Sequence, residues 1–405
     1  MSTHSASTQD DLRRINRARL LRRLHEAGPA RRSDLVAFSG LNRSTVGAVM
    51  ADLAESGVVR EVAGRPGQVG RPSLRVEPVS ESAVVVAFDL RVESTVVALV
   101  GLGGEELWRR EQEHARAKYT AKVAVKHLLS LTRQALRRAP EDAAWVGIGI
   151  AVPGIVDHAD GLVRFAPNLG WVDVPLGALL REAISAEYGF VPHLAISNDA
   201  DLGALAEHVR GVGADNRNLI YLSGEVGIGG GVIIDGRPML GAGGFGGEVG
   251  HMVVNPAGVQ CRCGATGCWE TVIGRDALVR AAGLKKDHAT VEDVIAAAAS
   301  GSDRARRALE EAGDWLGIGL ANLVNVFNPE VIVLGGHLRL LHPFASDAVD
   351  RHVLTAVPAA REQVRIEVPA LSGDSPLLGA AEAAFDALLA DPISVIADVA
   401  HASAS

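Results

Sequence analysis

Three cysteines and a histidine lie close together past the middle of the chain. Cys261, Cys263 and Cys268 are the only cysteines in 405 residues, and His251 precedes the first of them by ten positions. Three cysteines cannot all pair, and cysteines at this spacing in a reducing compartment are typical of metal binding. One imidazole and three thiolates complete a tetrahedral zinc site and leave no position open for water. The sequence therefore predicts a structural Zn(2+) ion; the alternative is three free buried cysteines.

A second set of polar residues is suited to binding a sugar. A sugar offers hydroxyl groups, so a selective pocket needs carboxylates and amides that accept and donate in pairs. The motifs PNLGW, SNDA, EVGH and CWE supply such residues, which are Asn168, Asn198, Asp199, Glu248, His251 and Glu270. Taken singly, an Asn-Asp pair is more often a helix cap or a turn. Taken together, these residues predict a sugar site, in which the zinc loop orders His251 and Glu270.

The first 75 residues have the charge and the helix pattern of a DNA-binding unit. They contain 13 arginines, no lysine and 7 acidic residues, whereas the whole chain has a net charge of −8. The apolar spacing predicts helices over 10–27, 33–39 and 43–57, with a glycine turn between the second and the third. This is the order of a helix-turn-helix, whose second helix presents its N-terminal residues to the major groove. The alternative is a three-helix module that binds another protein.

The segment after the third helix predicts the wing of a winged helix, because two strands flank a turn rich in Gly, Pro and Arg. Arginine pairs with guanine, small hydroxyl residues contact bases or phosphates, and wing arginines reach phosphates or the minor groove. We expect DNA contacts from Arg43, Ser44, Thr45, Gly47, Arg65 and Arg71.

Beyond residue 80 the chain predicts two comparable α/β halves. The first has strands at 81–90, 94–100 and 105–110, a helix over 121–139 and the strand WVGIGIAVPG; the second has strands NLIYLSG and GIGGGVIIDG, a helix over 302–327 and the strand EVIVLGG. Such a chain places its ligand between two lobes. We predict a winged helix over 1–75, a linker over 76–80, a first lobe over 81–197 completed by a helix over 372–390, a second lobe over 198–371 with the zinc loop, and a flexible tail over 391–405.

These motifs carry a resemblance to a known family. The segment GIGGGVIIDGRPMLGAGGFGGEVGH, the cluster CRCGATGCWE and SNDA resemble the ROK family of sugar kinases and repressors over about residues 81–390. The resemblance implies an α/β fold of two actin-like, hexokinase-like lobes, each related to ribonuclease H. It also implies the zinc ligands and sugar contacts named above. The winged helix and its GRPS junction resemble the repressor branch.

The resemblance to the kinases is incomplete at the two loops that hold the phosphates of ATP. Phosphoryl transfer needs Gly-rich backbone and hydroxyl groups around the phosphates. This chain has Arg91 and Val92 where the first loop has glycines, and Glu225 and Val226 where the second begins Gly-Thr. Asp199 stands at the position of the kinase base. We expect no kinase activity; the alternative is an ATP-dependent sugar kinase with an accessory DNA-binding segment.

The expected function is therefore that of a sugar-responsive repressor. Its expected partners are operator DNA, a small sugar effector and further copies of itself, as a homodimer or a homotetramer. No apolar run approaches the roughly 18–20 residues of a membrane span, and the N-terminus lacks the pattern of a signal peptide. We expect a cytoplasmic protein without a membrane partner.

Overall fold

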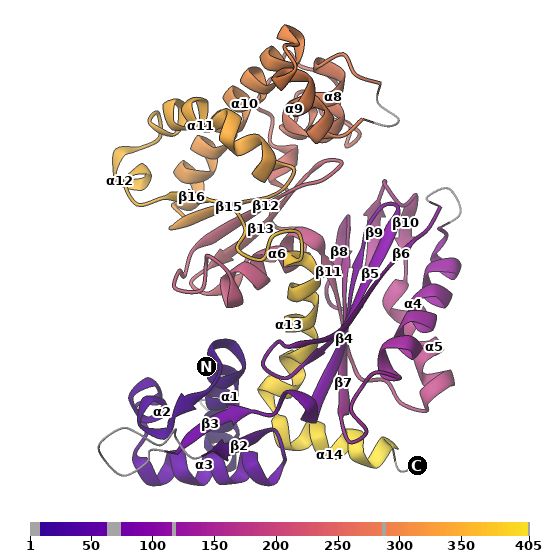
Figure 1. The fold of residues 1–405 in the computed structure, drawn as a ribbon, viewed down its shortest axis with the longest axis vertical. Coiled ribbons are helices and arrows are strands. Elements are labelled where there is room, and N and C mark those ends of the chain that lie inside the picture. Colours follow the sequence, from indigo (N-terminus) through magenta and orange to yellow (C-terminus); the bar gives the residue numbers. More distant parts are fainter. Residues whose placement is uncertain (1–8, 63–73, 116–118, 286–288, 404–405) are drawn as a thin grey trace, which may run out of the picture.

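The computed structural model describes residues 9–62, 74–115, 119–285 and 289–403. A small N-terminal unit lies against the first of two α/β lobes (Figure 1). In the N-terminal unit a three-stranded sheet of order β1-β3-β2 accompanies three helices. The bounds of these elements are α1 (Gln9–Ala27), β1 (Ala30–Arg31), α2 (Arg32–Ser39), α3 (Arg43–Glu55), β2 (Val59–Val62) and β3 (Arg75–Pro78). The three predicted helices and the two predicted strands are confirmed.

The apolar stripes of α1 and α3 form the core of the N-terminal unit. Leu20 and Leu24 of α1 pack with Met50 and Leu53 of α3, and all four are fully buried. Gly40 has a φ of 70°, which lets the chain turn tightly between α2 and α3. The helix pair of a helix-turn-helix therefore forms as its sequence predicts.

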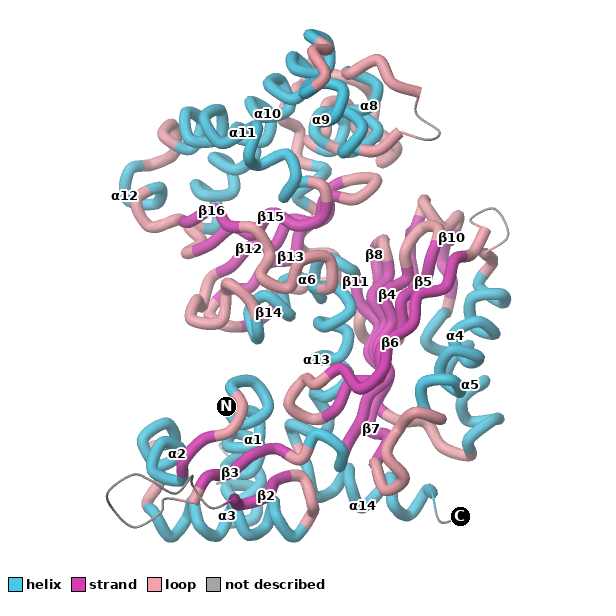
Figure 2. The backbone as a smooth tube through the Cα atoms, viewed as in Figure 1, coloured by secondary structure: helices cyan, strands magenta, loops and turns pink. Residues whose placement is uncertain are grey.

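The first lobe is built on a five-stranded sheet of order β11-β7-β4-β5-β6. Helices α4 (Ala121–Leu136) and α5 (Leu176–Tyr188) cover one face, and α13 (Ser375–Ala390) covers the other (Figure 2). The strands are β4 (Ala83–Leu90), β5 (Ser94–Gly101), β6 (Glu106–Glu113), β7 (Ala144–Val152) and β11 (His193–Asn198), preceded by the 3-10 turn η1 (Ser80–Ser82). A small sheet of β8 (Ile155–Asp157), β9 (Leu162–Ala166) and β10 (Trp171–Val174) extends this lobe.

Glycines in β7 explain how α13 reaches this sheet. A Cβ at Gly149 would lie 1.8 Å from the carbonyl oxygen of Ala380, and one at Gly147 would lie 2.3 Å from that of Ala384. Only glycine therefore allows the helix to approach the strand so closely.

The second lobe is built on another five-stranded sheet, of order β14-β13-β12-β15-β16. Its strands are β12 (Leu219–Gly224), β13 (Ile228–Ile234), β14 (Arg237–Pro238), β15 (Val331–Gly336) and β16 (Arg365–Glu367). Its helices are η3 (Val249–His251), α7 (Glu270–Ile273), α8 (Arg275–Ala281), α9 (Val291–Ala299), α10 (Asp303–Phe327), α11 (Leu338–Val353) and α12 (Pro358–Arg361). Helix α6 (Asp199–Arg210) connects the two sheets and packs beside α13 between the lobes.

Two segments differ from their predicted roles. Residues 76–80, predicted as a linker, continue strand β3 and enter η1, and the backbone N–H of Val79 donates to the carbonyl of Val58. Residues 391–405, predicted as a flexible tail, contain helix α14 (Pro392–Ser403), whose Val395, Ile396 and Val399 pack on the core of the first lobe. The prediction of a flexible tail rested on the Ser- and Ala-rich composition of this segment, which does not reveal the apolar face of the helix.

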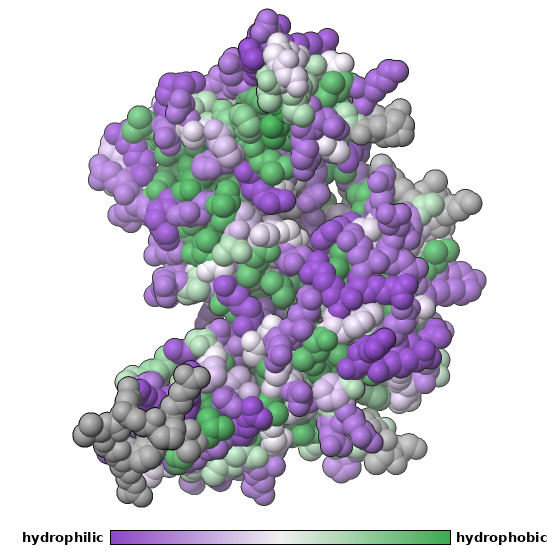
Figure 3. Space-filling model, in the orientation of Figure 1, coloured by the Kyte–Doolittle hydropathy of each residue, from purple (hydrophilic) through white to green (hydrophobic). Residues whose placement is uncertain are grey.

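The surface is mixed in polarity and is indented between the two lobes (Figure 3). No helix among the described residues is both long and apolar enough to cross a membrane.

Candidate functional site

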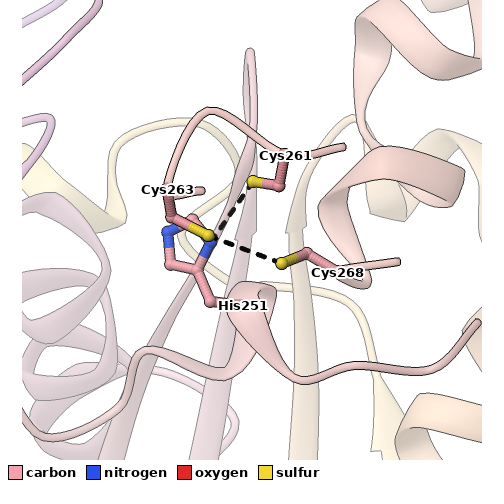
Figure 4. Close-up of side chains that lie close together, drawn as sticks. All are labelled: His251, Cys261, Cys263 and Cys268. Atoms are coloured by element: carbon pink, nitrogen blue, oxygen red, sulfur yellow. Dashed lines mark hydrogen bonds between the residues drawn. The ribbon is translucent and has the colours of Figure 1, made fainter. Parts of the chain in front are cut away.

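The predicted metal ligands converge on one point of the second lobe. His251 ends η3, and the three cysteines lie on the loop that leads to α7; their side chains point toward one another (Figure 4). One donor atom from each of His251, Cys261, Cys263 and Cys268 lies within 4.8 Å of the others. These four residues could therefore hold a metal ion.

The spacing of the donors fits a small tetrahedral ion. The Sγ atoms of Cys263 and Cys268 lie 3.6 Å apart, and Cys261 Sγ lies 3.7 Å from His251 Nδ1. Metal–sulfur bonds of 2.3 Å in a tetrahedron place neighbouring donors about 3.7 Å apart. Gly267 shapes the loop, since it has a φ of 81° and a Cβ there would lie 1.7 Å from the carbonyl oxygen of Asn255. If a metal binds, it joins η3 to the loop before α7.

Three of the predicted sugar contacts lie in or beside the metal cluster. His251 presents Nδ1 to the cysteines, and its Nε2 lies 3.8 Å from the carboxylate of Glu248. Glu270, the first residue of α7, accepts a hydrogen bond of 2.8 Å from the thiol of Cys261. The structure therefore brings Glu248, His251 and Glu270 together.

Asn198 and Asp199 stand at the start of α6, directly after strand β11. The Asn198 side chain accepts hydrogen bonds from the backbone N–H groups of Ala200 and Asp201, so it caps the helix, and it donates to the carbonyl of Gly154 at 2.8 Å. Asp199 accepts from the N–H of Ala200 through one carboxylate oxygen. The amide of Asn198 is thus engaged in the scaffold, and Asp199 is the freer of the two groups.

Three acidic side chains influence one another around this helix start. Burial, and then the nearby charges of Asp89 and Glu225, raise the pKa of Asp199 to about 8. Burial also raises the pKa of Asp89, at the end of β4, and that of Glu225, in the turn between β12 and β13. The cleft is consequently a region of crowded carboxylates in which a further negative charge is disfavoured.

The turn between β4 and β5 holds an arginine next to one of these acids. The Arg91 guanidinium donates to the Asp89 carboxylate at 2.7 Å and lies 3.6 Å from Glu111. The other turn, between β12 and β13, carries Glu225. Side chains of both signs therefore fill the two turns that were expected, from the family resemblance, to correspond to phosphate loops.

Asn168, the remaining predicted sugar contact, lies in the turn between β9 and β10 of the first lobe. Its side-chain oxygen accepts a hydrogen bond of 3.1 Å from Arg262, which lies between two of the predicted metal ligands. Arg262 thus joins the first lobe to the metal-binding loop of the second. Sequence analysis missed this residue, and its position inside the cysteine cluster was the available signal.

The predicted DNA contacts are presented at the start of α3. Asn42 caps this helix by accepting from the N–H of Thr45, and the Ser44 hydroxyl donates to the same Asn42 oxygen at 2.7 Å. Arg43 is exposed, and a Cβ at Gly47 would touch only the end of the Arg32 side chain, at 3.8 Å. The two wing arginines, Arg65 and Arg71, lie outside the described residues.

Comparisons with known proteins identify the family of this chain. The model of the ROK family matches residues 85–387. The chain belongs to the ROK family. It is 30% identical over 373 residues to the xylose repressor of Bacillus spizizenii, which covers 92% of this chain and 95% of that protein. It is also 30% identical over 251 residues to the glucokinase of Halalkalibacterium halodurans, which covers 58% of this chain and 74% of that protein.

Among solved structures, this ROK protein resembles a ROK family transcriptional regulator described as a homolog of the E. coli MLC protein. The TM-score is 0.77 at 24% sequence identity, and the match covers 95% of this chain and 99% of the other. That likeness shows the fold, including the N-terminal unit that lies before the family match.

Proposed function

We propose that this ROK protein is a sugar-responsive transcriptional repressor. It binds operator DNA through the start of α3 and the wing, and a sugar in the cleft between its lobes changes its affinity for that DNA. The DNA contacts are Arg43, Ser44, Thr45, Gly47, Arg65 and Arg71. Similarity to a xylose repressor over 92% of the chain supports this proposal, because an alignment of that length includes most of the N-terminal unit.

The observation that carries the proposal is the exposed start of α3 in a unit whose other side is buried against the effector lobe. An exposed arginine on the first turn of a recognition helix is placed to read a base edge. The protein acts on operator DNA in the cytoplasm as a homodimer or homotetramer, since two half-sites need two recognition helices.

The sugar contacts in this proposal are Asn168, Asn198, Asp199, Glu248, His251 and Glu270. A zinc ion on His251 and the three cysteines would hold Glu248 and Glu270 toward the cleft. Its role is structural, because the four protein ligands fill the tetrahedral coordination and leave no place for a water nucleophile.

The alternative function, an ATP-dependent sugar kinase, has the glucokinase similarity and Asp199 in its favour. Against it stand the Arg91–Asp89 ion pair and Glu225, since an ion pair and a carboxylate replace the backbone cradle that ATP phosphates need. We therefore assign no enzymatic activity. Incubation with Mg2+, ATP and D-xylose, D-glucose or N-acetyl-D-glucosamine tests this assignment; ADP release that Asp199→Asn abolishes would establish the kinase instead.

The test of the repressor begins with operator selection from random duplex DNA. Binding of the selected duplex is followed by fluorescence anisotropy with and without each of the three sugars. Allosteric coupling is typically worth about 1–3 kcal/mol, so one sugar should change operator Kd by about 5- to 150-fold. Failure to select any sequence, or equal operator Kd with every sugar, contradicts the proposal.

A further inference from the structure

Helix α6 has one end at the proposed sugar site and the other at the DNA-binding unit. It begins at Asp199 and ends at Arg210. Twelve residues rise about 18 Å along a helix axis, so a single rigid element spans the distance between the two places. Both ends carry side chains with specific partners.

At the far end, Arg210 enters a polar cluster shared by three parts of the fold. Its Nε donates to the carboxylate of Glu382 in α13 at 2.5 Å, and its NH1 donates to the carbonyl of Gly103 at 3.0 Å. A Cβ at Gly104 would lie 2.4 Å from the guanidinium carbon, so the turn after β5 wraps closely around this side chain. We call this cluster of Arg210, Glu382 and His25 the α6 junction.

His25 brings the DNA-binding unit into the α6 junction. It lies near the end of α1, is fully buried, and accepts a hydrogen bond of 2.9 Å from the N–H of Gly103 on Nδ1. The ring proton therefore lies on Nε2, from which it donates to Glu382 at 2.9 Å. The Arg210 guanidinium lies against the same ring edge, 2.9 Å from Nε2.

The junction bears on the recognition helix because α1 carries α3. Leu20, Leu21 and Leu24 of α1 share one buried core with Val49 and Leu53 of α3. A displacement of the end of α1 therefore moves α3 with it, since a close-packed core transmits displacement instead of absorbing it.

Helix α6 is also held firmly along its length. Glu207, fully buried, accepts hydrogen bonds from the Ser375 hydroxyl at 2.8 Å and from the backbone N–H groups of Ala370 and Leu371, which lead into α13. On the other side, a Cβ at Gly231 of β13 would lie 2.2 Å from the carbonyl oxygen of Ala200. The helix is thus in contact with both lobes and has little room to move without them.

We propose that Arg210, Glu382 and His25 are positioning residues through which α6 couples sugar occupancy at its start to the placement of α3 at the DNA. This inference rests on the proposed repressor function. A sugar that displaces the start of α6 displaces Arg210, and the buried contacts among Arg210, Glu382 and His25 carry that displacement into α1. Loss of the junction should uncouple the two ligands and leave each site able to bind.

The test compares Arg210→Gln and Glu382→Gln with a matched control, Arg22→Gln. Arg22 also joins α1 to α13, through a 2.8 Å ion pair with Asp386, but it is 43% exposed, and the ion pairs it makes among the described residues are with Glu26 of α1 and Asp386 of α13. The sugar probe is whichever of D-xylose, D-glucose and N-acetyl-D-glucosamine changes wild-type operator Kd most. The coupling ratio is operator Kd with that sugar divided by operator Kd without it.

We expect the coupling ratio to fall from the wild-type value, about 5- to 150-fold, to below about 2-fold in both junction variants and to stay at the wild-type value in Arg22→Gln. Sugar Kd without DNA, measured calorimetrically, should change less than about threefold. Hydrogen exchange in residues 20–27 should respond to sugar in the wild type and not in the junction variants. A merely structural role would lower the melting temperature and leave the ratio intact.

Outcomes separate the two proposals. A wild-type ratio of 1 removes the repressor proposal and this inference together. A wild-type ratio above 1 that both folded junction variants retain overturns this inference alone. If Arg210→Gln does not fold, Arg210→Lys replaces it, and a wild-type ratio in Arg210→Lys and Glu382→Gln has the same meaning.

Discussion

Replacing Asp199 by Asn should stabilise the protein more at high pH than at low pH. The ordinary pKa of an aspartate is 3.8, and burial together with Asp89 and Glu225 raises that of Asp199 to about 8. Between these values the folded state holds a proton that the unfolded state has lost. The stability contributed by protonated Asp199 is thus complete below pH 3.8 and is lost as pH rises through about 8. The Asn side chain keeps the shape and the hydrogen bond to Ala200 without the charge.

The size of the effect follows from the same difference. A tenfold change in proton affinity corresponds to about 1.4 kcal/mol, so a pKa that rises from 3.8 to about 8 sets an upper limit of about 6 kcal/mol. Asp199 is partly exposed, so solvent screens part of this energy, and we expect the stability difference between variant and wild type to grow by about 2–4 kcal/mol between pH 5 and pH 8.5.

Urea unfolding followed by tryptophan fluorescence, at pH 5, 7 and 8.5 in zinc-containing buffer, measures this difference. Asp142→Asn is the control, because it makes the same substitution at an exposed position. A stability difference for Asp199→Asn that stays constant across this range would refute the claim that the start of α6 lies among crowded carboxylates.

Three further predictions concern the metal, the DNA and the charge of the effector. Cys263→Ser should remove about one equivalent of bound zinc, which mass spectrometry measures. It should also weaken sugar binding by at least about tenfold, because the metal no longer holds His251 and Glu270 in place. A variant with the zinc content of the wild type would contradict the predicted set of metal ligands. Arg43→Ala should weaken operator binding by about 1–3 kcal/mol and relax the preference at one base pair, whereas Arg138→Ala, on an exposed part of the first lobe, should not; equal losses would show only a general charge effect. A sugar phosphate should bind more weakly than its parent sugar in calorimetry, because the Asp89 and Glu225 carboxylates, which help to raise the pKa of Asp199 to about 8, also disfavour a phosphate beside them. Tighter binding of the phosphate would show that Arg91 leaves Asp89 to receive it.

The elements with strong local patterns could be predicted from the sequence. The stripes of α1 and α3 repeat at helical spacing, and the strands of both sheets are continuous apolar runs between turns, so their positions depend on neighbours close in the chain. The four metal ligands could also be predicted from the sequence, because three of them lie within eight positions. Helix α6 was missed because SNDA is as typical of a turn as of a helix cap, and Asn198 is in fact the cap of that helix.

Contacts between distant parts of the chain could not be predicted in this way. His25 and Glu382 are 357 positions apart, and each is an ordinary helical residue in its own segment. Arg262 and Asn168 form a hydrogen bond although they are 94 positions apart. In the sequence, the loop that holds Arg262 is notable only for its cysteines. Such pairs depend on how whole helices pack, which no local periodicity encodes.

The buried core of the N-terminal unit continues without a break into the first lobe, where Phe385 and Leu388 of α13 belong to the same cluster as Leu24. Exchanging N-terminal units between ROK proteins, for example to build biosensors with new operators, therefore means more than replacing an independent domain on a linker. An N-terminal unit from another protein would pack against an α13 that does not match it. It would lose the apolar complementarity and the contact that His25 makes here with Glu382. Chimeras should fold and respond to sugar best when the residues of α13 that face the N-terminal unit are transferred together with it.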